Sequence, residues 1–134
     1  MDDEPTSPAQ QWLIKAEHDL ASARRLGSGE EPIPDTAAYH CQQAGEKALK
    51  AVLAWKGAAL RMTHDLRVLL DVLVGELPDL ESLRDAAELL TPYATAYRYP
   101  GDPAQPGEDE LQEALEAAER VFSVAKVLIA QSAP

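Results

Sequence analysis

Three of the four tyrosines of the chain lie within seven positions, and an arginine lies among them. Arg98 offers a planar fork of N–H donors that fits a phosphate or a carboxylate. Tyr97 and Tyr99 add ring faces for stacking and hydroxyl groups for hydrogen bonding. Residues 93–102 are therefore the first candidate for a ligand site. The alternative is a cluster that closes the end of a helical bundle, with Arg98 paired to Asp102 or to an acid on another helix.

A histidine near the expected start of a helix is the second candidate. His64 follows Thr63, a residue type that caps helix N-termini, and precedes Asp65. The positive end of the helix dipole disfavours a protonated imidazole, so a neutral His64 could accept a proton near neutral pH, although Asp65 would oppose this effect. The alternative is that His64 packs at a helix junction and bonds a backbone carbonyl.

Polar side chains at helical spacing form the third candidate. Gln42, Glu46 and Lys50 recur every four residues and would share one ridge of a helix, while Gln43, Lys47 and Lys50 would form the neighbouring ridge. With Arg98 nearby, the second ridge could bind an anionic ligand. The alternative is a solvated helix face that carries a simple Glu46–Lys50 pair.

The elements that must position these side chains are all expected to be helices, because the apolar spacing is helical throughout the chain. Gly45 lies inside one of these helices and indicates close approach by another backbone. Short connections predict an all-α fold, an antiparallel up-and-down bundle of four to five helices. We expect helices over residues 8–26, 36–55, 63–75, 79–100 with a bend near Pro92, and 111–129. Ser7, Asp35 and Thr63 are the expected caps of the first three.

Composition limits the function. The 134 residues, 46% hydrophobic and 26% charged, predict a single domain over residues 1–134, with its core at about 8–131 and a flexible start at 1–7. A net charge of −11, from 23 acidic and 12 basic side chains, argues against broad DNA binding, which needs Lys and Arg at many phosphates. Screening over roughly 8 Å still permits one local basic pocket.

Several other classes are disfavoured by what the sequence lacks. No apolar run reaches the ~18 residues of a membrane span, and the acidic start is unlike an export signal, so we expect a cytoplasmic protein without membrane contact. A single cysteine, Cys41, and three scattered histidines give no metal-ligand spacing. The glycines match no phosphate-binding loop. We therefore expect neither a metal nor a cofactor.

Four segments of the chain carry a pattern of residue types in a fixed order and spacing. They are Trp12-Leu13-x-Lys15-Ala16-x-x-Asp19-Leu20, Gln42-Gln43-Ala44-x-Glu46-Lys47-Ala48-Leu49-Lys50-Ala51, Thr63-His64-Asp65-Leu66 and Tyr97-Arg98-Tyr99-Pro100. Together they resemble one known family, the HEPN domain (higher eukaryotes and prokaryotes nucleotide-binding domain), and the resemblance covers roughly residues 10 to 130.

The resemblance implies a helical bundle that dimerises in a prokaryotic cytoplasm, often beside a small nucleotidyltransferase. In several branches it also implies a metal-independent ribonuclease of toxins and defence systems. Those branches use an arginine followed, after four to six residues, by a histidine. Such a pair is chemically sensible, because histidine can move the proton of an attacking 2′-hydroxyl while arginine stabilises charge on the phosphate.

This chain departs from that motif. The positions where a histidine would follow Arg98 hold Pro103, Ala104 and Gln105, and His64 follows Arg61 too closely. We therefore expect a homodimeric binding or regulatory component, with nucleotide or RNA as ligand and a nucleotidyltransferase partner, in a toxin–antitoxin-like or defence setting. One alternative is a ribonuclease toxin that uses Arg98 and His64. Another is a purely structural dimerisation module.

Overall fold

The computed structural model describes residues 6–101 and 105–131, which are helical with no strand in these two ranges. The α-helices are α1 (Pro8–Leu26), α2 (Pro34–Trp55), α3 (Leu66–Val74), α4 (Arg84–Leu90) and α5 (Glu108–Ala130). Two 3₁₀ segments, η1 (Pro78–Leu83) and η2 (Thr91–Ala94), flank α4. This confirms the all-α bundle.

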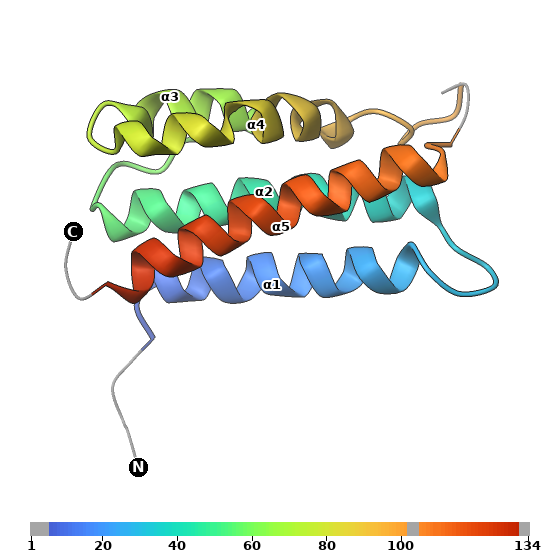
Figure 1. Ribbon diagram of the computed structural model, residues 1–134, viewed down its shortest axis with the longest axis horizontal. Coiled ribbons are helices and arrows are strands. Elements are labelled where there is room, and N and C mark those ends of the chain that lie inside the picture. The colour runs from blue at the N-terminus through green and yellow to red at the C-terminus, as the bar shows by residue number, and fades with distance from the viewer. Residues whose placement is uncertain (1–5, 102–104, 132–134) are drawn as a thin grey trace, which may run out of the picture.

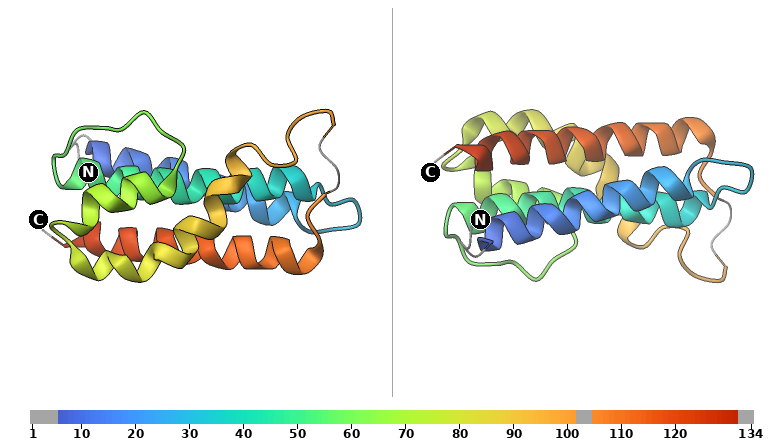
Figure 2. Two further views of the ribbon diagram at one scale, coloured as in Figure 1. Left: turned by 90° about the horizontal axis from the view of Figure 1, so that it is seen from above. Right: turned by 90° about the horizontal axis from the view of Figure 1, so that it is seen from below.

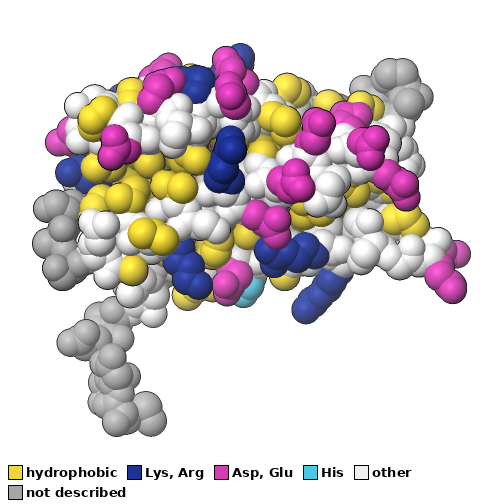
Figure 3. All heavy atoms as spheres, in the orientation of Figure 1, with side chains coloured by type: hydrophobic (Ala, Val, Ile, Leu, Met, Phe, Trp, Pro, Cys, Tyr) yellow, Lys and Arg dark blue, Asp and Glu magenta, His cyan; other side chains and the backbone are white. Residues whose placement is uncertain are grey.

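The three long helices α1, α2 and α5 lie side by side along the long axis of the molecule (Figure 1). The shorter helices α3 and α4 form a second layer across α2 and α5, as the views from above and below show (Figure 2). Acidic side chains are spread over α5 and over the α3–α4 layer on the face shown in Figure 3. None of the helices in the described ranges combines the length and apolarity required to cross a bilayer.

The start of α1 matches the expectation in detail. The Ser7 hydroxyl accepts a hydrogen bond from the Gln10 amide at 3.1 Å, and the Gln10 side chain accepts one from the Ser7 amide at 3.1 Å. This reciprocal capping box satisfies two amides that the helix cannot pair internally. Pro8, which has no amide proton, is the first helical residue.

Two other helix starts differ from the expected positions. The second helix begins at Pro34 instead of Thr36, so Asp35 lies inside its first turn and is not its cap. The third begins at Leu66, with Asp65 as the capping residue, because the Asp65 carboxylate accepts a hydrogen bond from the Arg67 amide at 2.9 Å. Thr63 instead accepts one from the Asp65 amide, which orders the turn before the helix.

The expected helix over residues 79–100 is divided into η1, α4 and η2 and ends at Ala94. Each 3₁₀ segment has a proline in its first turn. Proline lacks the amide proton that a continuous α-helix would use and crowds the preceding turn. The chain therefore leaves the helical path before Arg98, which places that residue on a loop.

Leucines from several helices fill the core. A fully buried leucine contributes roughly 1.5–3 kcal/mol relative to an exposed one. Gly45 lies where these helices meet: a Cβ there would come within 2.7 Å of Leu66 and 2.9 Å of Leu90. The expected close approach exists, but leucine side chains make it, not a backbone. The fully buried leucines are Leu20, Leu49, Leu53, Leu66, Leu69, Leu70, Leu83 and Leu90.

Candidate functional site

Arg98 lies over an aromatic ring of α2. Tyr97 has a φ of +64°, a left-handed conformation that few residues other than glycine adopt, and it turns the chain after η2. The Arg98 guanidinium carbon then lies 4.0 Å from the ring centre of Tyr39 and 5.7 Å from that of Tyr99. These distances are within the range of cation–π contact. The guanidinium is therefore positioned by two rings while the residue stays exposed.

Among the described residues, Arg98 makes one hydrogen bond through its guanidinium and no ion pair. Its Nη1 donates to the carbonyl of Ala94 at 3.0 Å. No acidic side chain within the described ranges forms an ion pair with it, and Asp102, one alternative partner, lies outside those ranges. A pocket of about 270 Å³ opens beside it. The pocket is lined by Asp35, Thr36, Tyr39, His40, Tyr97 and Arg98.

His40 is the histidine that shares this pocket with Arg98. Its Nδ1 lies 2.7 Å from Oδ1 of Asp19, and Oδ2 of Asp19 accepts a hydrogen bond from Nζ of Lys47 at 2.7 Å. Asp19 is only 7% exposed, so α1 carries a buried carboxylate that binds two side chains of α2. An imidazole held at Nδ1 by a carboxylate keeps Nε2 available for another partner.

His64 lies at a different place. Its Nδ1 is 2.9 Å from Oε1 of Glu46, although its side chain is 72% exposed. The connection between α2 and α3 runs back along α2 to reach this position, and Gln42 fixes it by donating to the His64 carbonyl at 2.9 Å. His64 does not line the Arg98 pocket.

The ridge of Gln42, Glu46 and Lys50 is buried, so the alternative of a solvated face is wrong. Glu46 is 3% exposed, and its Oε2 accepts a hydrogen bond from Lys50 Nζ at 2.8 Å. Burial alone would raise the pKa of the Glu46 carboxyl, but hydrogen bonds from Lys50, His64 and Gln42 outweigh it and hold the pKa below its usual value. Gln43 joins the same network through Gln42, at 2.7 Å.

The two tyrosines beside Arg98 differ in their roles. The Tyr97 hydroxyl donates to Glu110 at 3.2 Å, next to the Tyr93 hydroxyl, which donates to the same carboxylate at 2.6 Å. Tyr97 therefore ties the loop to α5. Tyr99 is 59% exposed and borders Arg98.

Sequence reasoning missed Asp19 and His40 as site residues. The available signal was the spacing of two basic side chains. His40 and Lys47 lie seven residues apart, so they share one face of a helix and could both face an acid on the first helix.

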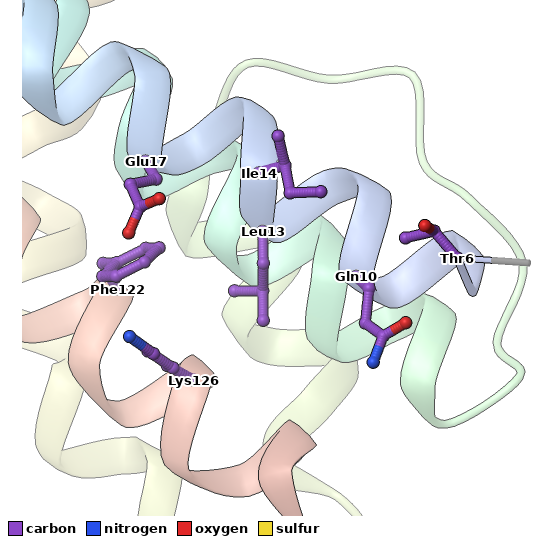
Figure 4. A pocket seen from close by; sticks show the side chains of 7 residues that line it. All are labelled: Thr6, Gln10, Leu13, Ile14, Glu17, Phe122 and Lys126. Atoms are coloured by element: carbon purple, nitrogen blue, oxygen red, sulfur yellow. The ribbon is translucent and has the colours of Figure 1, made fainter. Parts of the chain in front are cut away.

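A separate hollow of about 340 Å³ lies between α1 and α5. Figure 4 shows Leu13 and Ile14 on α1, with Phe122 and Lys126 reaching from α5. The Lys126 ammonium is 5.9 Å from the Phe122 ring centre. This hollow is mainly apolar and is lined by none of the candidate site residues predicted from the sequence.

Known proteins resemble the chain along most of its length. The model of the HEPN domain matches residues 9–128. The crystal structure of TT1696 from Thermus thermophilus is similar, with a TM-score of 0.77 and 32% identity over 89% of this chain and 96% of that chain. The crystal structure of ST0689, an archaeal HEPN homologue, gives a TM-score of 0.70 and 29% identity over 90% and 97% of the two chains. No curated protein matches.

Proposed function

The chain belongs to the HEPN domain family, and from this membership and its Arg98 pocket we propose that it is a nucleotide- or RNA-binding component. The observation that carries the proposal is the exposed Arg98 guanidinium, held against Tyr39 without an acidic partner in the described ranges. An arginine oriented in this way can bind a phosphate through two parallel hydrogen bonds. The exposed ring of Tyr99 offers a stacking surface for a base.

The size and charge of the Arg98 pocket indicate which part of a nucleotide it binds. A volume of about 270 Å³ is at the lower limit for a small-molecule site, so it suits a phosphate with its sugar better than a dinucleotide. Asp35 also lines the pocket and repels a phosphate, so the anion belongs on the side of Arg98 and His40.

The test is calorimetric titration with AMP and with a short oligoadenylate. Arg98→Ala should weaken binding about tenfold or more, because hydrogen bonds to a charged group are lost. Arg98→Lys should recover only part of the affinity, since lysine has no planar fork. Arg120→Ala removes an arginine of α5 that lies outside this pocket and serves as the matched control. Equal affinity in Arg98→Ala and the unchanged protein would refute the proposal.

A second candidate is a metal-independent ribonuclease, and the geometry favours His40 over His64 for it. His40 shares the pocket with Arg98 and is oriented by Asp19. Its Nε2 would take the proton of a 2′-hydroxyl, whose oxygen attacks the adjacent phosphorus. The bond to the 5′-oxygen then breaks, that oxygen takes a proton from solvent, and a 2′,3′-cyclic phosphate remains.

This candidate predicts RNA cleavage in chelator buffer that is lost in His40→Ala and Arg98→Ala and retained in His64→Ala. Intact RNA across pH 6 to 9 would eliminate it. Cleavage that depends on His64 instead would restore the pair expected from the sequence.

Homodimerisation and a nucleotidyltransferase partner remain part of the proposal, and family membership supports both. Co-expression with a neighbouring nucleotidyltransferase should yield a complex at micromolar concentration, and separate elution of the two proteins would contradict it. A purely structural module would keep its dimer and its partner in Arg98→Ala and His64→Ala, and would bind no nucleotide.

A further inference from the structure

A second pocket lies along the α1–α2 groove and differs in character from the rest of the surface. It has a volume of about 560 Å³ and is lined by Pro8, Gln11, Trp12, Lys15 and Lys47. No acidic side chain of the described ranges lines it, although the whole chain has a net charge of −11. A lysine-rimmed aromatic pocket on an acidic protein is complementary to an anionic ligand with a planar ring.

This second pocket is coupled to the Arg98 pocket through one carboxylate. Lys47 lines the second pocket and donates to Asp19, and the other oxygen of Asp19 holds His40 in the first pocket. From Tyr39, beneath Arg98, to Lys47 the helix rises about 12 Å at 1.5 Å per residue. From Tyr39 to Lys50, which borders Trp12, the rise is about 17 Å.

Trp12 provides the ring surface of the second pocket. The Lys50 ammonium lies 5.6 Å from its ring centre, and the same ammonium is fixed by Glu46. The exposed Lys15 lies one turn further along α1. Aromatic rings flanked by cations are the usual platforms for bases of single-stranded nucleic acids.

We propose that the ligand is a single-stranded oligonucleotide that spans both pockets, with a phosphate at Arg98 and a base against Trp12. This inference rests on the proposed function of the Arg98 pocket and extends it. Stacked nucleotides rise about 3.4 Å each, so the rise of roughly 12 to 17 Å along α2 from Tyr39 to Lys47 and Lys50 corresponds to about four to six nucleotides. A mononucleotide would fill only one pocket.

The experiment measures affinity and tryptophan fluorescence with oligoadenylates of one to eight nucleotides. Affinity should rise at least tenfold between AMP and the pentanucleotide and then level off. In a Trp55→Phe background, where Trp12 is the only tryptophan, the pentanucleotide should quench the fluorescence and AMP should not. The deoxyadenylate pentamer tests whether the protein distinguishes the sugar. Affinity equal to that of the RNA pentamer indicates binding of any single strand, and weaker affinity indicates a preference for RNA.

Variants separate the two pockets. Trp12→Ala should weaken the pentanucleotide at least fivefold and leave AMP binding unchanged, as expected for loss of a stacking platform. Lys15→Ala, at an exposed residue of α1, should act in the same direction. Trp55→Ala is the matched control, because its ring also lies beside a lysine, Lys56 at 5.9 Å, but lines neither pocket.

These measurements distinguish failure of the two-pocket ligand from failure of the proposed function. Equal affinity for AMP and the pentanucleotide, with Arg98 still required, overturns the two-pocket ligand and keeps the proposed function. Quenching of Trp12 by AMP also overturns it, because the second pocket would then be a separate mononucleotide site. If neither ligand binds, both the inference and the proposed function are wrong.

Discussion

At the scale of single residues, Glu46 shows how a charge is kept inside this bundle. Its carboxylate is buried and accepts hydrogen bonds from Lys50, Gln42 and His64, which come from α2 and from the connection before α3. Burying an ion pair costs several kcal/mol in lost hydration, which only good geometry and further hydrogen bonds repay. Removing one partner leaves the other charge uncompensated, so the network is sensitive to substitution.

Glu46→Gln should lower the free energy of unfolding at pH 7 by about 3 kcal/mol, because Lys50 stays buried without its partner. The folded pKa of Glu46 lies below its usual value of 4.5, so its ionised form stabilises the fold above that pH. This contribution is lost as the pH falls through the folded pKa. Urea denaturation at pH 7 and at lower pH should therefore show the difference between variant and unchanged protein narrowing in acid.

Glu119→Gln is the control for this prediction. It removes an ion pair with Arg24 at 2.7 Å whose two side chains are both exposed, and such pairs contribute about 0–1 kcal/mol. A constant difference between Glu46→Gln and the unchanged protein at every pH would show that the carboxylate charge does not act as described.

At the scale of elements, the contact between α2 and its covering helices depends on the absence of one Cβ. Gly45→Ala would place that atom 2.7 Å from Leu66 of α3 and 2.9 Å from Leu90 of α4. Both leucines are fully buried and have little room to move. We expect a loss of about 1–3 kcal/mol in unfolding free energy from overpacking, in spite of the better helix propensity of alanine.

Gly75→Ala is the matched comparison. Gly75 has a helical φ of −60°, and a Cβ there would meet no heavy atom within 4 Å. The substitution should be neutral or stabilise by up to about 1 kcal/mol, because alanine loses less backbone entropy on folding. Thermal unfolding of both variants gives the test, and a stable Gly45→Ala would mean that α3 and α4 can shift away from α2.

The sequence predicted α1 well because its signals are local: a serine cap, a proline at the first position and an apolar stripe. The region from Pro78 to Ala94 was harder to predict, because two signals conflict there. Its leucines and alanines have the spacing of one long helix, while its two prolines allow only short helical segments. The choice between one bent helix and three short ones depends on packing against α3 and α5. Helix capping by Asp65 instead of Thr63 likewise depends on the path of the preceding connection.

At the scale of the whole molecule, the candidate site could be predicted only in part. Arg98 and its tyrosines stand out by type and proximity in the sequence. The pairing of Asp19 with His40 arises from packing between α1 and α2 across 21 positions, which no local pattern encodes. His64 and Arg98 both lie in segments that resemble the HEPN family. In the fold, however, His64 contacts Glu46 and Arg98 contacts Tyr39.

The distribution of charge gives a further prediction. Of the 12 basic side chains, several are paired to exposed acids, such as Arg24 and Arg84, and only Arg98, Lys15 and Lys47 line the two pockets. For single strands, the logarithm of the affinity falls with the logarithm of salt concentration with a slope of about −0.7 per phosphate contact. Lys47 is already paired with Asp19, so the two contacts left to Arg98 and Lys15 predict a slope of about −1.4 for the pentanucleotide.

Titrations between roughly 50 and 300 mM NaCl give this slope, over the range where phosphate contacts are screened progressively. Lys15→Ala should reduce its magnitude to about 0.7, because one contact is lost, and Arg120→Ala should leave the slope at about −1.4. A slope several times steeper would require most of the basic residues to contact phosphates. That result would contradict binding in one local groove, because the acidic side chains spread over α5 and the α3–α4 layer repel a longer strand (Figure 3).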